Sequence, residues 1–278
     1  MDGKTAAVQM RNITKSFGSV VANDKVWLDI YRGEILALLG ENGSGKTTLM
    51  NMLSGIYYPD EGQIFVDGRE VSIRSPKDAF DLGIGMIHQH FKLVDVLTAA
   101  ENIILGLPGK GRLDLNKVAE KIKSICDAYG FEVDPKKKIY DMSVSEKQTV
   151  EIVKVLYRGA DILILDEPTA VLTPQETDKL FAVLRNMRDD GKSVVIITHK
   201  LHEVEDLSDR VAILRRGQFV GDMLTKKTNA AEMTNIMVGR PVSLNIERPE
   251  PKDPQPRLVV ENLTVRDEDG VLKLDDVS

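Results

Sequence analysis

Apolar and polar positions follow two different periods along the start of the chain. Between Val8 and Ile30, short alternating runs are interrupted at Gly18 and at Asn23-Asp24, which predicts antiparallel strands. The run 35–39 is apolar throughout, as expected of a strand that is buried on both faces. Helical spacing then follows at Leu49, Met50, Met52, Leu53 and Ile56. We therefore expect a small antiparallel layer and then a buried strand that leads into a helix.

Strands and helices continue to alternate up to residue 240. Residues 92–159 have helical periodicity and predict a helical insertion. A further helix should begin at Thr173, where Pro174 and Glu176 complete an N-terminal cap, and end at Gly191. More strands are predicted for the hairpin 63–71 with its turn at Asp67-Gly68, for the buried runs 162–165 and 194–198, and for the hairpin 210–223 with its turn at Arg216-Gly217. These patterns predict an α/β fold with a mostly parallel core sheet, flanking helices, an N-terminal antiparallel β subdomain and the helical insertion.

The pattern changes again after residue 240. Five prolines stand between positions 241 and 256, a composition that is typical of a linker. Val260–Thr264 then resembles Met10–Thr14, and Asp275–Val277 resembles Asp24–Val26, at offsets of 250 and 251 residues. We therefore expect a domain over 1–240, a linker over 241–256 and the start of a second copy of the domain over 257–278, with chance similarity as the alternative.

Composition and charge narrow the class of protein. The net charge of −6 gives no general attraction to nucleic acid. No apolar run approaches the roughly 20 residues of a membrane-spanning helix, and the first residues lack the apolar centre of a signal peptide. Cys126 is the only cysteine and lies in an apolar helical pattern, which indicates a packed thiol. We expect a cytosolic protein with no nucleic-acid partner.

A glycine-rich segment follows the buried strand and opens the helix. Residues 40–47, Gly-Glu-Asn-Gly-Ser-Gly-Lys-Thr, fit the pattern G-x-x-x-x-G-K-[ST] of a phosphate-binding loop. Gly43 and Gly45 let the backbone turn tightly towards phosphate oxygens, Lys46 can reach the terminal phosphates, and Thr47 can place its hydroxyl on magnesium. A glycine-rich turn without a ligand is the alternative, but the strand before it and the helix after it favour phosphate binding.

Two acidic residues end the buried run 162–165. An acidic residue at the carboxyl end of a parallel strand beside a phosphate loop can hold magnesium, and its neighbour can deprotonate an attacking water. We assign the first role to Asp166 and the second to Glu167. The pair therefore supplies the second half of a nucleotide-hydrolysing site.

The order and spacing of these motifs resemble the nucleotide-binding subunits of ABC transporters over residues 8–240, which implies a P-loop NTPase of ABC type. The resemblance implies catalytic roles for Gln89, which contacts magnesium and the attacking water, and for His199, which contacts the γ-phosphate. Phe17 falls where the family stacks an aromatic ring on adenine, although packing within the β layer would explain it as well. The implied cofactors are ATP, bound by Phe17, Gly40, Asn42, Gly43, Ser44, Gly45, Lys46, Thr47 and Thr48, and Mg²⁺, bound by Thr47, Gln89 and Asp166.

The signature segment, Met142–Gln148, departs from the family pattern Leu-Ser-Gly-Gly-Gln. In the family this segment binds the ATP of the opposite domain. Against the pattern Leu-Ser-[Ile/Val]-Gly-Glu-Gln-Gln of the sugar-importer branch, Ser143, Glu146 and Gln148 are kept here. Ser145 replaces a glycine, and its Cβ could crowd the phosphate, so we hypothesise that this composite site is weakened. Ser145 and Gln148 could alternatively serve as a capping box for the helix that follows.

The function implied by the resemblance is ATP hydrolysis that powers a membrane importer. The segment after Gln89 and the tandem arrangement resemble the fused ATPases of simple-sugar and nucleoside importers. The implied partners are a second ABC domain, integral membrane permease subunits and, indirectly, an extracytoplasmic solute-binding protein. The implied location is the cytoplasmic face of the membrane. Alternatives are a soluble tandem ATPase that acts on a ribosome or nucleic acid, and a nucleotide-gated scaffold with little hydrolysis.

Overall fold

The structure, a computed structural model, describes residues 5–107, 114–240, 258–267 and 270–278. They fall into two compact units, Met1–Val242 and Ser243–Ser278. The predicted linker 241–256 lies outside the described residues. Within the described ranges, no helix is both long enough and apolar enough to cross a membrane.

A six-stranded sheet forms the centre of the first unit, in the order β10-β9-β3-β8-β7-β6. Its strands are parallel except for the edge strand β10, which pairs antiparallel with β9. The strands are β3 (Ile35–Leu39), β6 (Ile84–Ile87), β7 (Ile162–Asp166), β8 (Ser193–Thr198), β9 (Arg210–Arg215) and β10 (Gln218–Leu224). The predicted α/β fold class is thus confirmed, as are the buried runs at β3, β7 and β8.

A second, antiparallel sheet has the order β2-β1-β4-β5 and confirms the predicted β subdomain. Its strands are β1 (Ala6–Phe17), β2 (Val20–Tyr31), β4 (Glu61–Val66) and β5 (Arg69–Val71). The predicted interruption at Asn23-Asp24 is wrong, because β2 runs through both residues and Asn23 pairs with Lys15. Irregularities in the β1–β2 register accommodate these polar residues inside a continuous strand.

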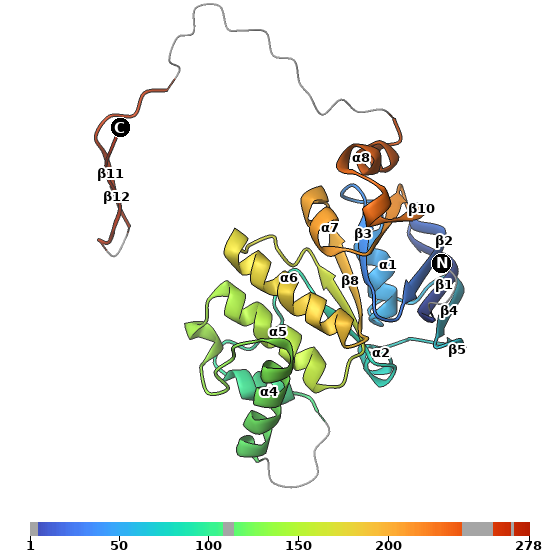
Figure 1. The fold of residues 1–278 in the computed structure, drawn as a ribbon, viewed down its shortest axis with the longest axis horizontal. Helices are drawn as coiled ribbons and strands as arrows, with labels where there is room; N and C mark the ends of the chain where they lie inside the picture. The colour runs from blue at the N-terminus through green and yellow to red at the C-terminus, as the bar shows by residue number, and fades with distance from the viewer. Residues whose placement is uncertain (1–4, 108–113, 241–257, 268–269) are drawn as a thin grey trace, which may run out of the picture. The chain divides into compact units, whose positions relative to one another are not determined.

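Helices cover both faces of the central sheet. Leu36 and Leu38 of β3 pack with α1 (Lys46–Leu53), whereas Ile35, Ala37 and Leu39 pack with α6 (Pro174–Asp189) on the other face. Figure 1 shows α1 and α6 on opposite sides of β3 and β8. Alternate side chains of one strand therefore enter two cores, which explains why its sequence is apolar throughout. The remaining helices around the sheet are α2 (Pro76–Asp81), α7 (Leu201–Leu207), α8 (Ala230–Val238) and the short 3₁₀ turn η2 (Thr225–Lys227).

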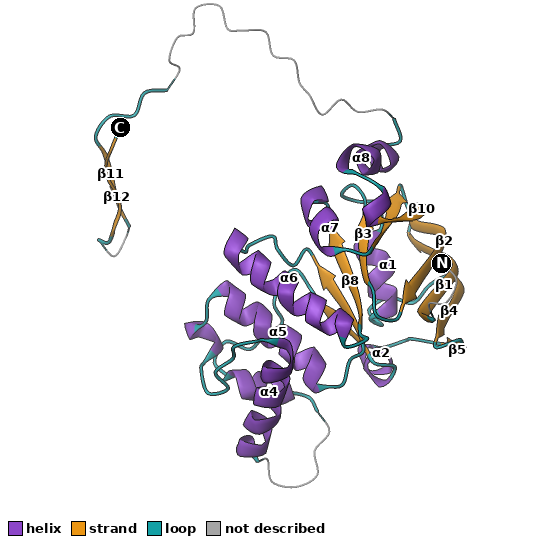
Figure 2. Cartoon of the chain, in the orientation of Figure 1, coloured by secondary structure: helices purple, strands orange, loops and turns teal. Residues whose placement is uncertain are grey.

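The described residues of the segment 92–159, namely 92–107 and 114–159, form a helical group with its own small core. It contains α3 (Ala99–Ile104), α4 (Leu115–Tyr129), the 3₁₀ turn η1 (Ile139–Asp141) and α5 (Val144–Tyr157), seen as purple helices beside the sheets in Figure 2. Cys126 is buried in this core with Ile122 and Val153, as predicted for a packed thiol. Burial raises the pKa of the Cys126 thiol to about 11, so the group stays protonated at neutral pH.

The second unit contains one antiparallel pair, β11 (Leu263–Arg266) and β12 (Leu272–Val277), and every residue of both strands is exposed. Its local geometry repeats that of β1 and β2. The hydroxyl of Thr264 accepts a hydrogen bond from the backbone of Asp276 at 3.2 Å, and the hydroxyl of Thr14 accepts one from Lys25 at the same distance. Further matches are the pairs Leu263↔Val277 and Ile13↔Val26, and the positive φ angles of Asn262 (52°) and Asn12 (52°).

Candidate functional site

The phosphate loop connects β3 to α1 and needs glycine at two close approaches. Gly45, with φ of 95°, stands directly before α1, and a Cβ there would lie 2.3 Å from the carbonyl oxygen of Ala22. A Cβ on Gly40 would lie 2.3 Å from the carbonyl oxygen of Leu214. Gly43 has φ of 80° and open space around it, so its requirement is conformational. The loop therefore has the tight turn that its sequence predicted.

Lys46 lies folded over this loop. Its Nζ donates to the carbonyl oxygens of Gly40 at 2.7 Å and Glu41 at 3.0 Å. Burial lowers the pKa of Lys46, and the nearby carboxylates of Glu167 and Asp166 oppose that shift. An ammonium held this way can exchange its carbonyl partners for phosphate oxygens, which would strengthen its electrostatic interactions.

Thr47 and Asp166 are in contact and line the same cleft, although they are far apart in the sequence. The Thr47 hydroxyl donates to Oδ2 of Asp166 at 3.0 Å, and Gln89 lines the same cleft. Burial raises the pKa of Asp166, and the hydrogen bond from Thr47 opposes that shift. Hydroxyl, carboxylate and amide oxygens are the hard ligands that Mg²⁺ prefers, so these residues fit a magnesium site.

Glu167 and His199 form a contact at the ends of two neighbouring strands. Nδ1 of His199 lies 2.8 Å from Oε1 of Glu167, whereas Oε2 of Glu167 is buried and has no protein hydrogen-bond partner. Glu167 also has a φ of 48°, a conformation that costs energy for a residue with a Cβ. Its backbone nitrogen donates to Ile197 at 2.9 Å, which ties this strained turn to β8. One carboxylate oxygen is therefore oriented by histidine while the other is available to accept a proton.

A single cleft of about 270 Å³ collects most of the predicted site residues. From that prediction it contains Asn42, Gly43, Ser44, Gly45, Lys46, Thr47, Thr48, Gln89, Asp166 and Glu167. Gly40, the first residue of the loop, does not line the cleft, and His199 reaches the cleft through Glu167. Phe17 does not line the cleft. It is half-exposed at the end of β1 and packs edge-to-face against Tyr57, with ring centroids 5.0 Å apart.

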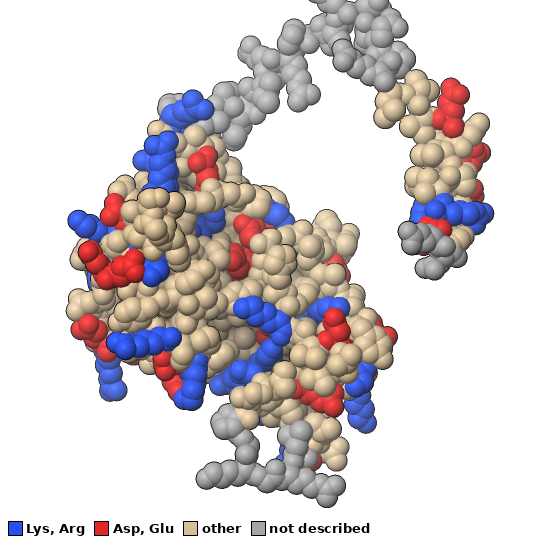
Figure 3. Space-filling model, turned by 180° about the vertical axis from the view of Figure 1, so that it is seen from behind, with Lys and Arg blue, Asp and Glu red and all other residues tan. Residues whose placement is uncertain are grey.

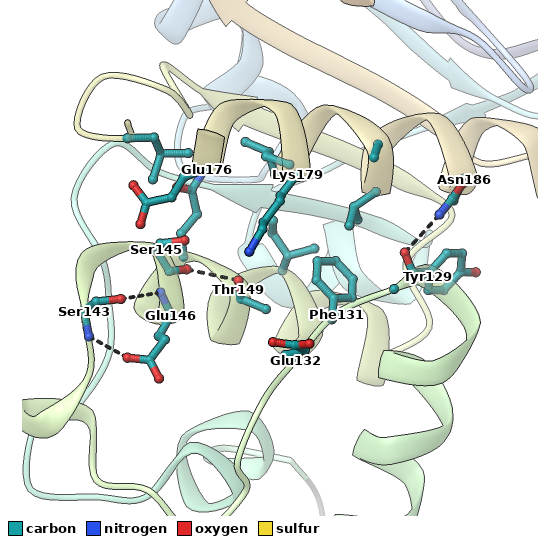
Figure 4. A pocket seen from close by; sticks show the side chains of 17 residues that line it. Tyr129, Phe131, Glu132, Ser143, Ser145, Glu146, Thr149, Glu176, Lys179 and Asn186 are labelled. Carbon is teal, nitrogen blue, oxygen red and sulfur yellow. Dashed lines mark hydrogen bonds between the residues drawn. The ribbon is translucent and has the colours of Figure 1, made fainter. Parts of the chain in front are cut away.

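The signature segment lies away from this cleft. Ser143, Ser145 and Glu146 line a separate cavity of about 490 Å³ between α5 and α6 (Figure 4). The carboxylate of Glu146 accepts hydrogen bonds from the Ser143 backbone at 2.7 Å and from Lys137 at 2.6 Å. The structure therefore does not bring these residues to the phosphate loop of their own domain.

The predicted capping box of Ser145 and Gln148 is wrong. Ser143 caps α5 instead, because its backbone is extended and its hydroxyl accepts from the nitrogen of Glu146 at 3.2 Å. Ser145 already lies within the first turn of the helix. Gln148 is buried, and its side-chain amide donates to the carbonyl oxygen of Pro168 at 2.7 Å.

Two residues that support the phosphate loop were not found from the sequence. The side-chain amide of Asn23 donates to the carbonyl oxygen of Gly45 at 3.3 Å. The backbone nitrogen of Gly217 donates to the carbonyl oxygen of Ser44 at 3.1 Å. The backbone nitrogen of Asp24 in turn donates to Gly217 at 2.8 Å. The strand β2 and the β9–β10 turn thus hold the loop from outside, whereas the sequence marked these positions only as an interruption at Asn23-Asp24 and a turn at Arg216-Gly217.

Comparison with known proteins gives close relatives over almost the whole chain. The family model described as "ABC transporter" matches residues 23–170. The nucleoside import ATP-binding protein NupA of Lactococcus lactis subsp. cremoris is 48% identical over 274 residues, which are 98% of this chain and 54% of NupA. The guanosine import ATP-binding protein NupO of Bacillus subtilis is 47% identical over 98% of this chain and 54% of NupO. The ribose import ATP-binding protein RbsA 2 of Escherichia coli O157:H7 is 42% identical over 94% of this chain and 52% of that protein. The chain spans about half the length of these relatives.

Solved structures agree on the fold. The ADP conformation of MJ1267, an ATP-binding cassette of an ABC transporter, superposes with a TM-score of 0.73 at 24% identity, covering 84% of this chain and 95% of that chain. CbiO1 from Clostridium perfringens, part of the ABC transporter complex CbiONQ, superposes with a TM-score of 0.70 at 26% identity. It covers 80% of this chain and 90% of CbiO1.

Proposed function

This chain belongs to the ABC transporter family, and we propose that it binds ATP with magnesium and hydrolyses the ATP to power the import of a small solute. The observation that carries the proposal is the convergence of three groups at one cleft. They are the phosphate loop, the Thr47–Asp166 hydrogen bond and the Glu167–His199 contact. Phosphate binding, a metal site and a base are the parts that phosphoryl transfer to water requires.

Each of these residues has a separate role in the proposed reaction. Lys46 and the N-terminus of α1 hold the terminal phosphates. Thr47, Gln89 and Asp166 would hold magnesium, which neutralises phosphate charge when bound. Glu167 accepts the proton of the attacking water through its unpaired oxygen, while His199 orients the carboxylate. Phe17 would stack on adenine.

A second domain would complete each ATP site. In this proposal Ser143, Ser145 and Glu146 face the ATP of the opposite domain, which is consistent with their distance from their own phosphate loop. Residues 257–278 would begin that second domain, joined by the linker 241–256. The repeated register and hydrogen bond of β1–β2 in β11–β12 support this assignment.

The solute is proposed from the relatives. Those named above are import ATP-binding proteins for nucleosides, guanosine or ribose, so we assign a nucleoside or simple sugar. The proposed partners are membrane permease subunits and, indirectly, an extracytoplasmic solute-binding protein. The chain would lie peripherally on the cytoplasmic face of the membrane. These relatives do not support the soluble alternative. On the face of the molecule shown in Figure 3, basic and acidic side chains are interspersed.

The decisive variant is Glu167→Gln in the full-length protein assembled with its permease. We expect ATP to bind with nearly wild-type affinity, and the hydrolysis rate to fall by about 10² to 10⁴, as for the loss of a general base. Solute uptake into vesicles should fall with it. ATP binding is measured by calorimetry, and hydrolysis by phosphate release.

The matched control is Glu120→Gln, which removes an exposed carboxylate on α4 and should leave turnover unchanged. Retained hydrolysis in Glu167→Gln would assign the base to another residue. Co-purification of the wild type with RNA, and without membrane proteins, would favour the soluble alternative.

A further inference from the structure

The signature helix makes a direct, buried contact with the loop that carries the proposed base. Gln148 lies about one turn into α5, and its side-chain amide donates to the carbonyl oxygen of Pro168 at 2.7 Å. Only 4% of Gln148 is exposed. Pro168 is the residue directly after Glu167 in the chain. A buried amide in this position exchanges few partners with water, so its hydrogen bond to Pro168 is a rigid connection.

The loop after β7 is held from two sides. On the core side, Nζ of Lys200 donates to the carbonyl oxygen and to the hydroxyl of Thr169, both at 3.0 Å. On the side of the helical insertion, Gln148 holds Pro168. The strained backbone of Glu167, with φ of 48°, stands next to both attachments. A small displacement of either one therefore changes the direction of the Glu167 carboxylate.

The contact between the insertion and α6 leaves room for such a displacement. A cavity of about 490 Å³ lies between α5 and α6 (Figure 4). At its far end, the amide of Asn186 donates to the carbonyl oxygen of Tyr129 at 3.1 Å, and the Tyr129 hydroxyl donates to Asp190 at 2.6 Å. At the near end lie Ser145 and Glu176. Ile152 of α5 and Leu180 and Val183 of α6 line the cavity and belong to one buried core, so the free space lies on one side of the packed contact between the two helices.

The position of Ser145 supports this arrangement. Glu176 caps α6 through Thr173, and hydrogen bonds from the Thr173 backbone and hydroxyl lower the pKa of Glu176, with a smaller contribution from the Ser145 hydroxyl. Ser145 and Glu176 line the same end of the cavity, so the signature segment faces the start of α6, while Gln148 holds Pro168.

We propose that Gln148 is a positioning residue for hydrolysis, because it couples the position of the signature helix to the direction of the Glu167 carboxylate. The inference rests on the proposed function, which takes Glu167 as the base and places the signature against the ATP of the opposite domain. ATP at one composite site then shifts α5, α5 shifts Pro168, and the base of the other composite site is aligned. The coupling predicts positive cooperativity between the two sites.

The test uses the full-length protein with its membrane subunits and the variants Gln148→Met and Gln148→Glu. Methionine has a similar length and no donor, whereas glutamate keeps the shape and replaces the donor by an acceptor. ATP affinity should stay within about twofold of the wild type, kcat per bound ATP should fall at least about tenfold, and the Hill coefficient should approach 1. Gln9→Met, on β1 in the β subdomain, is the matched control and should leave all three values unchanged.

Three results would overturn the proposal. A wild-type kcat and Hill coefficient in Gln148→Met, measured while Glu167→Gln is inactive, would refute the coupling and leave the proposed function standing. A loss of bound ATP in proportion to the loss of turnover would show that Gln148 only supports folding. Turnover retained in Glu167→Gln would instead refute the assignment of the base, and the coupling with it.

Discussion

At the scale of single residues, the candidate site contains polar side-chain atoms that either lack a hydrogen-bond partner or hold partners that a ligand can replace. Glu167 has one oxygen on His199 and the other unpaired, and Lys46 rests on loop carbonyls that phosphate can replace. Ser145 is different, because its position in the first turn of α5 places a Cβ where the family pattern has glycine. Any effect of Ser145 on catalysis therefore comes from one methylene group and one hydroxyl group.

Replacing Ser145 by glycine tests this hypothesis. If the side chain crowds the phosphate of the opposite ATP, Ser145→Gly should raise the ATPase rate of the intact transporter several-fold. Glycine also costs α5 about 0.5 to 1 kcal/mol, so a small fall in thermal stability is expected. Ser145→Ala keeps the Cβ and is the control that separates crowding from loss of the hydroxyl. An unchanged or lower rate in Ser145→Gly would remove the hypothesis.

At the scale of elements, the two sheets are joined by a buried ion network. Arg210 of β9 contacts Glu34 at 2.7 Å and Asp222 of β10, and it donates to the carbonyl oxygen of Asp29 in β2. Arg210 and Glu34 are 1% and 2% exposed. The network ties β2 to the central sheet, and the strand β2 also carries Asn23, which supports the phosphate loop.

Removing one member of this network should be costly. Arg210→Met leaves the Glu34 carboxylate buried without its cation, and we expect the free energy of unfolding to fall by about 3 to 5 kcal/mol. Urea denaturation measures the change. The double variant Arg210→Met/Glu34→Gln should recover part of the loss, because the buried position 34 then carries no charge and the remaining carboxylate, Asp222, is 35% exposed. Arg69→Met, at an exposed position on β5, should change stability by less than about 0.5 kcal/mol. A loss below about 1 kcal/mol in Arg210→Met would contradict the role of the network.

At the scale of the whole molecule, the site lies where the parallel strands β3 and β7 end and where helix α1 begins. Ligands of open α/β sheets bind at these carboxyl ends. The helical insertion with the signature segment is attached beside this edge, so one domain presents a phosphate loop and a signature in different places. That separation gives the physical reason for expecting two domains per working site.

The number of ATP molecules bound tests the proposed tandem arrangement. We expect calorimetry on the full-length protein to give two ATP sites, and one after Lys46→Ala, because that variant removes the ammonium from a single phosphate loop. The present chain alone should bind one ATP, with an affinity at least about tenfold weaker in Lys46→Ala. Lys123→Ala, at an exposed position on α4, is the control. One site in the wild-type full-length protein would contradict a functional second domain.

Much of the site was predictable because its geometry is local. The turn at Gly43 and Gly45, the cap of α6 at Thr173, and the acidic residues at the end of β7 each depend on neighbours a few residues away. Alternation and apolar runs likewise predicted the two sheets, because a strand with two buried faces must be apolar throughout.

Contacts between distant segments were decided only by the tertiary structure. The sequence could not show that Asn23 and Gly217 hold the phosphate loop, or that β2 runs through Asn23 without a break. The sequence also suggested that Ser145 and Gln148 form a capping box at the start of one helix, whereas the side-chain amide of Gln148 donates to the carbonyl oxygen of Pro168. The physical reason is that a polar side chain can satisfy its hydrogen bonds locally or across the fold, and only packing decides between these partners.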